Sequence, residues 1–165
     1  MLLALVAGSL LVRCDAGEER DELARGGGEL SARVIEVVDG DTIIVELAGG
    51  RRESVRYIGI DTPESNPDQP LECFGHEAEA ENARLVADRV VALELGPESR
   101  DDYGRLLAFV RAGSEPDSLI NAELVEGGFA RTLTIAPNDS LAPFLRRLES
   151  AAARAGRGLW GACDK

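Results

Sequence analysis

ARVIEVVDGDTIIVELAGGRRESVRYIGID, residues 32–61, decides the fold class of this chain. β-Branched residues are frequent and nearly alternate through 32–38 and 42–47, and a turn then leads into a third extended segment, 52–60, so three consecutive strands are predicted. Asp39-Gly40-Asp41 and Ala48-Gly49-Gly50 supply the turns between them. Short consecutive strands joined in this way favour a small closed barrel over a doubly wound sheet.

The rest of the domain adds helices and two further strands. Helical spacing of apolar residues predicts helices over 75–90, 118–126 and 140–155. Strands are expected at 91–95 and 106–110, separated by a polar loop at 96–105, and 129–135 is short and extended. The segment 61–70 carries three prolines and is predicted to be loop. The pattern indicates an α+β, mainly β fold, with a five-stranded OB-type barrel and about three α-helices as the first choice.

The first thirty residues have the composition of a targeting signal followed by a flexible linker. Residues 2–12 form an apolar run, which is shorter than the roughly 20 residues of a membrane-spanning helix and is typical of a secretory signal. Cys14 follows this run, so 1–14 is predicted to be a signal peptide or a lipoprotein-type signal with Cys14 as the lipidation site. Residues 15–30 are acidic and rich in glycine, typical of a linker. The folded domain is expected at 31–165.

Composition excludes several classes of function. Eighteen Lys and Arg against 30 Asp and Glu give a net charge of −12, which argues against a protein that coats nucleic acid through a basic surface. It does not exclude an enzyme whose cations are confined to one site. One histidine and three widely spaced cysteines exclude zinc-finger and thioredoxin-type sites. A domain of this size is expected to be a monomer.

Acidic and basic side chains gather where the predicted strands end. Asp39 and Asp41 flank Gly40 in a turn, while Asp61, Thr62 and the nearby Glu64 follow the third strand. Such oxygen ligands select a hard cation, Ca²⁺ or Mg²⁺, and irregular loops favour Ca²⁺. Ordinary turn chemistry is the alternative explanation for each acid taken alone.

Two arginines near these carboxylates favour a functional site over ordinary turn chemistry. Arg56 lies five positions before Asp61, an odd offset that puts the two on opposite faces of a flat strand unless the chain bends, for which Gly59 is a suitable place. Arg105 closes the loop before the fifth strand. Two arginines and a hard cation would stabilise the charge of phosphodiester hydrolysis, and Glu64 would orient or deprotonate the attacking water.

These residues stand in motifs that resemble the staphylococcal nuclease (thermonuclease) family. The motifs are V-x-D-G-D-T at 37–42, R-x-x-x-I-D-T-P-E at 56–64 and D-x-Y-G-R at 101–105. They occur across the whole domain in the order of the family and with fitting spacing. Weaker matches are F-G-x-E-A at 74–78, the run at 121–130 and the final G-L-W.

The resemblance implies an OB-fold barrel and Ca²⁺-dependent endonucleolytic cleavage of DNA and RNA that leaves 3′-phosphates. Carried over by motif position, the implied catalytic residues are Arg56, Glu64 and Arg105. The implied Ca²⁺ ligands are Asp41, Asp61 and the Thr62 carbonyl, with Asp39 close to the metal. Tyr103 matches a tyrosine that touches the substrate phosphate.

Two departures from the family concern substrate binding. Two tyrosines used around the nucleotide are replaced here by Leu133 and Ile135, and a commonly basic position is Asp102. Together with the acidic composition, these changes predict weaker binding of nucleic acid with the chemical machinery intact.

Two cysteines remain once Cys14 is assigned to the predicted signal. In an exported protein, Cys73 and Cys163 are expected to form a disulfide rather than two independent buried thiols. An exported nuclease is the preferred function, either secreted or tethered to the membrane through the N-terminus. A catalytically silent OB-fold module that binds nucleic acid or protein is the alternative; such a module has no need to keep both arginines and three site carboxylates together. A structural lipoprotein would leave the arginines unexplained.

Overall fold

The computed structural model describes residues 29–65, 70–112 and 118–163. The predicted signal at 1–14, Cys14 as a lipidation site and most of the linker at 15–30 lie outside the described residues. None of the helices in the described ranges is long and apolar enough to cross a bilayer.

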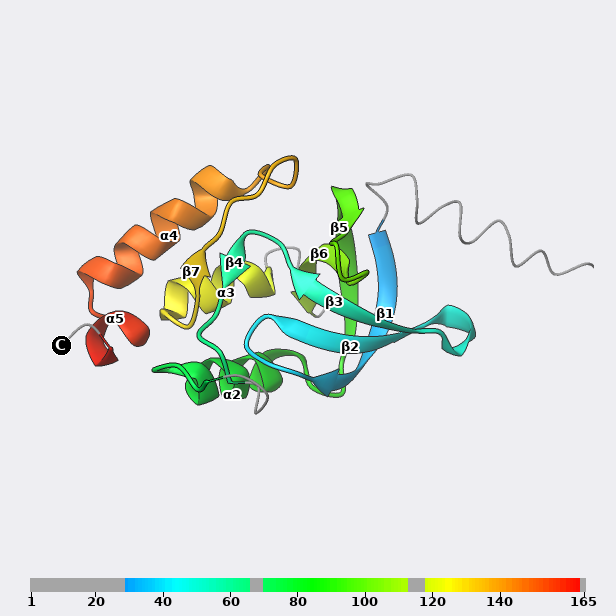
Figure 1. Ribbon diagram of the computed structural model, residues 1–165, viewed down its shortest axis with the longest axis horizontal. Helices are drawn as coiled ribbons and strands as arrows, with labels where there is room; N and C mark the ends of the chain where they lie inside the picture. The colour runs from blue at the N-terminus through cyan, green and yellow to red at the C-terminus, as the bar shows by residue number, and fades with distance from the viewer. Residues whose placement is uncertain (1–28, 66–69, 113–117, 164–165) are drawn as a thin grey trace, which may run out of the picture.

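Five strands close into a barrel, which confirms the predicted fold class (Figure 1). They are β1 (Glu29–Val37), β2 (Thr42–Leu47), β3 (Arg52–Tyr57), β5 (Val90–Arg100) and β6 (Leu106–Ala112). The order around the barrel is β1-β2-β3-β6-β5, and β1 returns to pair with β5. Only the β3–β6 pairing within the barrel is parallel.

Side-chain alternation explains how the strands fill the barrel. In β2, Ile43 and Val45 are fully buried, because every second side chain of a strand points to the same face. Val34 of β1 lies opposite Val45, and an irregularity in the β1–β2 register follows between Val34 and Glu36. The larger of the two clusters of buried core residues is aliphatic apart from Tyr57, and the smaller one contains Phe109. The apolar contacts of the core supply the main driving force for closure.

Helices and a small second sheet surround one end of the barrel. They are α2 (Gly75–Val86), α3 (Ile120–Gly127), α4 (Ala142–Arg154), the short α5 (Leu159–Ala162), and the two-stranded pair β4 (Ile60–Asp61) and β7 (Arg131–Thr132). A single 3₁₀ turn, Ala48–Gly50, joins β2 to β3. Figure 1 shows α2 running beneath the barrel and β4 and β7 between the barrel and α4. The three predicted helices are therefore present, with shorter bounds.

The predicted third strand, 52–60, is wrong at its end. β3 stops at Tyr57, and Ile60 and Asp61 form β4, which pairs with β7 instead of continuing in the barrel. The break falls at Gly59, whose φ of +81° is a conformation that favours glycine. A Cβ at this position would also lie 2.7 Å from the Leu145 side chain, so two constraints select glycine here.

The predicted polar loop at 96–105 is also wrong over its first half. β5 continues to Arg100, although Gly96 and Pro97 are poor strand residues. The side chain of Asn138 takes the place of a neighbouring strand: its Oδ1 accepts the N–H of Glu98 at 3.0 Å, and its Nδ2 donates to the Glu98 carbonyl at 2.8 Å. A partner forty residues away cannot be read from local sequence patterns.

Other boundaries differ by a few residues. β1 starts at Glu29, three residues before the predicted strand. The first helix ends at Val86 rather than at 90, because Asp88 has a φ of +59°, which is incompatible with a continuing helix. The last predicted helix, 140–155, is observed as Ala142–Arg154.

A disulfide joins the start of α2 to the end of the described chain. Cys73 and Cys163 are bonded, with 5.9 Å between their Cα atoms. The predicted pairing is therefore present in the structure, and it links segments 90 positions apart.

A buried polar contact ties α2 to the barrel and to the turn after β1. The hydroxyl of Tyr57 donates to Asn82 Oδ1 at 2.9 Å, and Asn82 Nδ2 donates to the Asp39 carbonyl at 2.8 Å. Tyr57 and Asn82 are buried almost completely. Since buried polar groups are costly when unpaired, this contact both stabilises the fold and fixes the turn.

We predict that Asn82→Ala lowers the free energy of unfolding by about 2–3 kcal/mol, because the Tyr57 hydroxyl and the Asp39 carbonyl lose their partner. Urea denaturation measures the change. In a Tyr57→Phe background the same substitution should cost less, since the hydroxyl is already absent. Equal costs in both backgrounds would contradict the assigned contact.

Candidate functional site

Three segments meet at one mouth of the barrel and line a hollow of about 280 Å³. They are the turn between β1 and β2, the end of β3 with the chain through β4, and the loop after β5. Its lining includes the residues that the sequence predicts to be catalytic or to bind the metal: Asp39, Asp41, Arg56, Asp61, Thr62, Glu64 and Arg105. The structure thus brings together all the predicted catalytic and metal-binding residues.

Asp41 occupies the deepest position of the site. Its side chain is 6% exposed, and its Oδ2 accepts the Thr62 N–H at 2.8 Å and lies 3.0 Å from Arg56 Nη1. The Thr42 hydroxyl donates to Oδ1 at 3.2 Å, and Asp39 Oδ1 accepts the N–H of Asp41 at 2.9 Å. The turn therefore holds the Asp41 carboxylate pointing at the segment that contains Thr62.

Gly40 allows the turn to approach that segment. A Cβ on Gly40 would lie 2.7 Å from the Cβ of Thr62, closer than side-chain atoms pack. Glycine is required because of this approach rather than because of its backbone angles.

Arg56 joins β3 to β4 through a bend. Its Nη1 donates to the Ile60 carbonyl at 2.9 Å and to the Tyr57 carbonyl at 3.1 Å, and its Nη2 donates to Asp61 Oδ1 at 2.7 Å. The bend at Gly59 resolves the odd offset between Arg56 and Asp61, which now lie in one site. The Arg56 side chain is 14% exposed, and its guanidinium is held on several sides by these hydrogen bonds.

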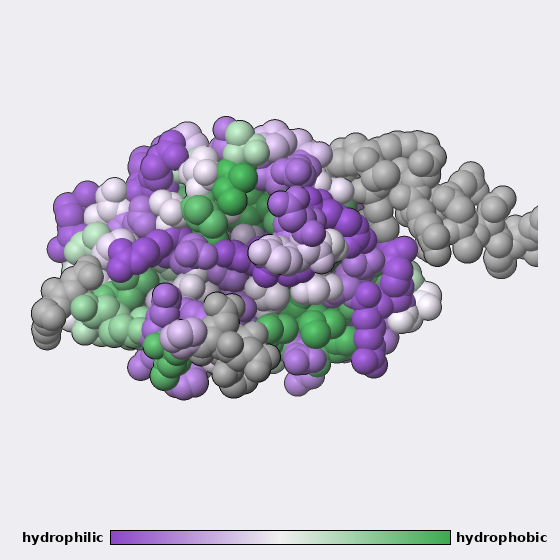
Figure 2. Space-filling model, viewed as in Figure 1, coloured by the Kyte–Doolittle hydropathy of each residue, from purple (hydrophilic) through white to green (hydrophobic). Residues whose placement is uncertain are grey.

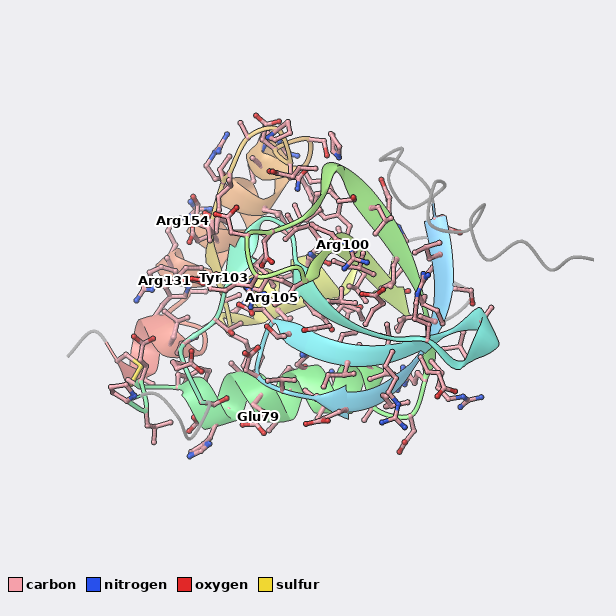
Figure 3. All side chains as sticks on the ribbon, turned by 45° about the vertical axis from the view of Figure 1, so that its right-hand side comes forward. Glu79, Arg100, Tyr103, Arg105, Arg131 and Arg154 are labelled. Carbon is pink, nitrogen blue, oxygen red and sulfur yellow. A yellow bond between two sulfur atoms is a disulfide. The ribbon has the colours of Figure 1, made fainter. Side chains whose placement is uncertain are left out.

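Arg105 is oriented by Asp101 within the loop after β5. Asp101 Oδ2 accepts Arg105 Nε at 2.7 Å, while Oδ1 accepts the backbone N–H groups of Tyr103 and Arg105 at 3.0 and 2.9 Å. Burial alone would raise the pKa of Asp101, but the hydrogen bonds from Arg105 and Tyr103 outweigh it and lower the pKa. Figure 3 shows Tyr103 and Arg105 near each other, and the guanidinium carbon lies 5.5 Å from the ring centre.

A second arginine supports this loop and was missed by sequence reasoning. Arg100 Nη1 donates to the Gly104 carbonyl at 2.5 Å, and its two terminal nitrogens reach the Glu53 carboxylate at 3.0 Å each. Glu53 belongs to β3, 47 residues earlier. Nothing in the local sequence pattern connects the two residues. Their contact can be recognised only in the folded structure, where β3 and the end of β5 lie near each other.

Glu64 lies at the rim of the hollow and is half-buried. Its Oε1 accepts the N–H of Ser65 at 3.1 Å, and its own N–H donates to Glu72 Oε2 at 3.1 Å. The residue belongs to neither a helix nor a strand. Its position is therefore set by contacts within the loop.

The electrostatics of the site favour an added cation. Burial raises the pKa of Asp41 to about 7; Arg56 and the Thr62 N–H oppose the increase, while Asp39 and Asp61 add to it. Within the described ranges no three His, Cys, Asp or Glu side chains are grouped closely enough to hold a metal by themselves. Two carboxylates supplemented by the Thr62 carbonyl and water fit a hard cation, because such ions accept mixed oxygen ligands.

A second hollow of about 330 Å³ adjoins the first and shares Arg56 and Arg105. Its lining includes Tyr103, which is 86% exposed, and Leu133 and Ile135, which are 39% and 60% exposed. Acidic side chains, Asp102 among them, also line this hollow. It offers apolar and acidic contacts beside the two arginines, together with the exposed ring of Tyr103.

Comparisons with known proteins agree with this site. The family described as staphylococcal nuclease homologue matches residues 54–162. A thermonuclease of Staphylococcus hyicus is 30% identical over 161 residues, covering 97% of this chain and 93% of the relative. A thermonuclease of Staphylococcus intermedius is 36% identical over 137 residues, 82% of this chain and 77% of the relative. Endonuclease YncB of Bacillus subtilis (strain 168) is 36% identical over 96 residues, 57% of this chain and 44% of the relative.

The family match covers more than half of the chain, and the two thermonucleases are matched over most of their length. The predicted family and the predicted class of enzyme, a nuclease that hydrolyses phosphodiester bonds, are both confirmed. The chain belongs to the staphylococcal nuclease family.

Proposed function

We propose that this protein is an exported, Ca²⁺-dependent endonuclease that hydrolyses DNA and RNA and leaves 3′-phosphates. The observation that carries the proposal is the convergence of Arg56, Glu64 and Arg105 on one hollow beside Asp41 and Asp61. The choice of substrate, product and ion comes from the family resemblance, and export comes from the sequence of residues 1–14.

The two arginines act on the phosphate. Hydrolysis of the phosphodiester concentrates negative charge on the phosphoryl oxygens, and guanidinium groups stabilise that charge through paired hydrogen bonds. Arg56 is fixed by two backbone carbonyls and Asp61, and Arg105 by Asp101. Because both side chains are oriented before substrate binds, little reorganisation is needed in the transition state.

Glu64 acts on the attacking water. Its carboxylate is placed to orient the water or to accept its proton as the oxygen bonds to phosphorus. The bond from phosphorus to the 5′ oxygen breaks, and that oxygen takes up a proton from solvent water and leaves as the 5′-hydroxyl. Asp41, Asp61 and the Thr62 carbonyl would hold Ca²⁺, with Asp39 nearby, and the ion would supply further charge stabilisation at the phosphate.

A catalytically silent binding module is the second candidate. Its support is the fold itself, which serves binding functions in many proteins. The exposed Tyr103 and the hollow beside it would serve such a module equally well. The first candidate is preferred because a binding module does not need Glu64 and Arg105 at the same hollow as the buried carboxylate of Asp41 and the exposed carboxylate of Asp61.

The proposal includes export, either as a free secreted enzyme or with a membrane tether at Cys14. It also includes a monomeric state. Hydrophilic residues cover most of the face shown in Figure 2, with smaller apolar areas between them. This mainly hydrophilic face supports the proposed monomeric state.

We predict that Glu64→Gln lowers kcat for single-stranded DNA by about 10²- to 10⁴-fold, because glutamine cannot accept the proton of the water. The purified oxidised protein is assayed with Ca²⁺, with Mg²⁺ and with chelator, and cleavage is expected only with Ca²⁺. The variant should still bind Ca²⁺. Wild-type protein that is folded and loaded with Ca²⁺ but cleaves neither DNA nor RNA would favour the binding module.

We predict that Ca²⁺ affinity falls about tenfold from pH 8 to pH 6, because protons compete for Asp41, whose pKa is raised to about 7. The raised pKa also means that the metal-free protein binds more protons when folded than when unfolded between about pH 4 and 7. The stability from neutral Asp41 is therefore complete below the unfolded pKa and is lost as pH rises to about 7. Calorimetry with Ca²⁺ and thermal melts of the metal-free protein measure the two effects; a Ca²⁺ affinity that is constant from pH 6 to 8 contradicts the assignment.

We predict that Leu133→Tyr/Ile135→Tyr lowers KM for single-stranded DNA about tenfold with little change in kcat. Stacking of a base on an aromatic ring contributes about 1–3 kcal/mol, and neither substituted residue touches the Arg56 side chain or Glu64 in the contacts described above. Leu133→Met/Ile135→Met serves as a control that keeps the hollow apolar. An unchanged KM in the tyrosine variant overturns the idea that these positions weaken binding.

A further inference from the structure

Two hydrogen bonds join the backbone of Glu64 to the same residue, Glu72. The N–H of Glu72 donates to the Glu64 carbonyl at 3.0 Å. In the opposite direction, the N–H of Glu64 donates to Glu72 Oε2 at 3.1 Å. Because Glu64 lies in a loop, these two bonds replace the support that a helix or strand would give.

The start of α2 closes around the same carbonyl. Gly75 donates its N–H to the Glu72 carbonyl at 3.1 Å. A Cβ on Gly75 would lie only 2.2 Å from the Glu64 carbonyl oxygen, so the helix start packs directly on the Glu64 backbone. Residues 72–75 thus form a compact turn, here called the Glu72 turn, that holds Glu64 from one side.

Two contacts with other parts of the fold hold the Glu72 turn in place. Cys73 is bonded to Cys163, which follows α5, and the Phe74 ring packs on Phe129 with 5.6 Å between ring centres. Phe74 has a φ of +73°, an uncommon conformation for a bulky residue that persists only where the surroundings enforce it. The disulfide at the preceding residue and the contact of the Phe74 ring with Phe129 supply that enforcement.

The far end of the disulfide rests on a rigid part of the fold. Leu159, at the start of α5, donates its N–H to the Gly128 carbonyl at 2.9 Å and is buried. Cβ atoms built on Gly128 and Gly158 would each lie within 2.3 Å of the other segment's backbone. The disulfide therefore connects the loop of Glu64 to the packed contact between α3 and α5.

We propose that Glu72 is a positioning residue for Glu64, and that the Cys73–Cys163 disulfide holds Glu72 in the geometry that this role requires. The proposal rests on the proposed role of Glu64 toward the attacking water. Reactions that depend on a positioned group lose about 10²-fold for a displacement near 1 Å. Phosphate binding is separate, since Arg56 and Arg105 are held by β3, β4 and the loop after β5 and make no described contact with the Glu72 turn.

The test compares kcat and KM on single-stranded DNA, with saturating Ca²⁺ and oxidised full-length protein. Glu72→Ala should lower kcat at least tenfold and leave KM within about twofold. Glu72→Gln keeps a carbonyl acceptor for the Glu64 N–H, so its kcat should lie between those of the alanine variant and the wild type. Glu77→Ala removes an equal charge from the first turn of α2 without a described contact to Glu64, and its kcat should match the wild type.

The disulfide is tested by Cys73→Ser/Cys163→Ser, assayed at a temperature where thermal melts show that every variant is folded. Its kcat should also fall with little change in KM, and adding Glu72→Ala should lower kcat by a smaller factor than in the disulfide-bonded protein. If the double serine variant does not fold, the alanine and glutamine variants of Glu72 still decide the positioning role. A double serine variant that folds and keeps wild-type kcat overturns the role of the disulfide.

A Glu64→Gln background separates this proposal from the proposed function. With Glu64 already inactive, Glu72→Ala should cause no further loss in the residual rate. An equal loss in both backgrounds, or a Glu72→Ala variant with wild-type kcat, overturns the positioning role while Glu64 keeps its own. If Glu64→Gln itself retains wild-type kcat, it is the proposed role of Glu64 that fails.

Discussion

The guanidinium of Arg56, set against the buried carboxylate of Asp41, is the contact on which the site depends. Both side chains are largely removed from water, and burying either charge alone would cost several kcal/mol. A buried pair of this kind contributes little net stability, but loss of one partner leaves the other uncompensated. Arg56 also binds the Ile60 carbonyl and Asp61. One group therefore fixes the relative positions of β3, β4 and the turn after β1.

The same contact leaves the site short of positive charge. Arg56 faces Asp41 and Asp61, and Asp39 stands beside Asp41. The raised pKa of Asp41 is the physical expression of this imbalance: in the absence of another cation, burial and neighbouring carboxylates favour its neutral form. A divalent cation would restore the ionised form and join the arginines in opposing phosphate charge.

Much of this arrangement could be predicted from the sequence where short-range rules apply. The strand at 42–47 follows from alternation, and the convergence of Arg56 with Asp61 follows once a bend is placed at Gly59. Prediction was wrong where distant segments decide the local structure. β5 runs through Gly96 and Pro97 because Asn138 satisfies the backbone of Glu98. The support of the Arg105 loop by Arg100 and Glu53 depends on a contact between strands, which no periodicity encodes.

The acidic composition and the arginines of the site act over different distances. A net charge of −12 repels a polyanion, but screening limits that repulsion to about 8 Å at physiological ionic strength. In the proposed mechanism, Arg56 and Arg105 would act on the phosphate at contact distance within the hollow, where screening is weak and the two groups are already oriented. Under the proposed function, ground-state affinity would depend on the whole surface and on Tyr103, Leu133 and Ile135, which line the adjoining hollow. The rate of hydrolysis would depend on groups that are fixed inside the fold. Changes of surface charge and of the adjoining hollow can therefore alter how tightly this nuclease holds its substrate while leaving the chemistry of cleavage intact.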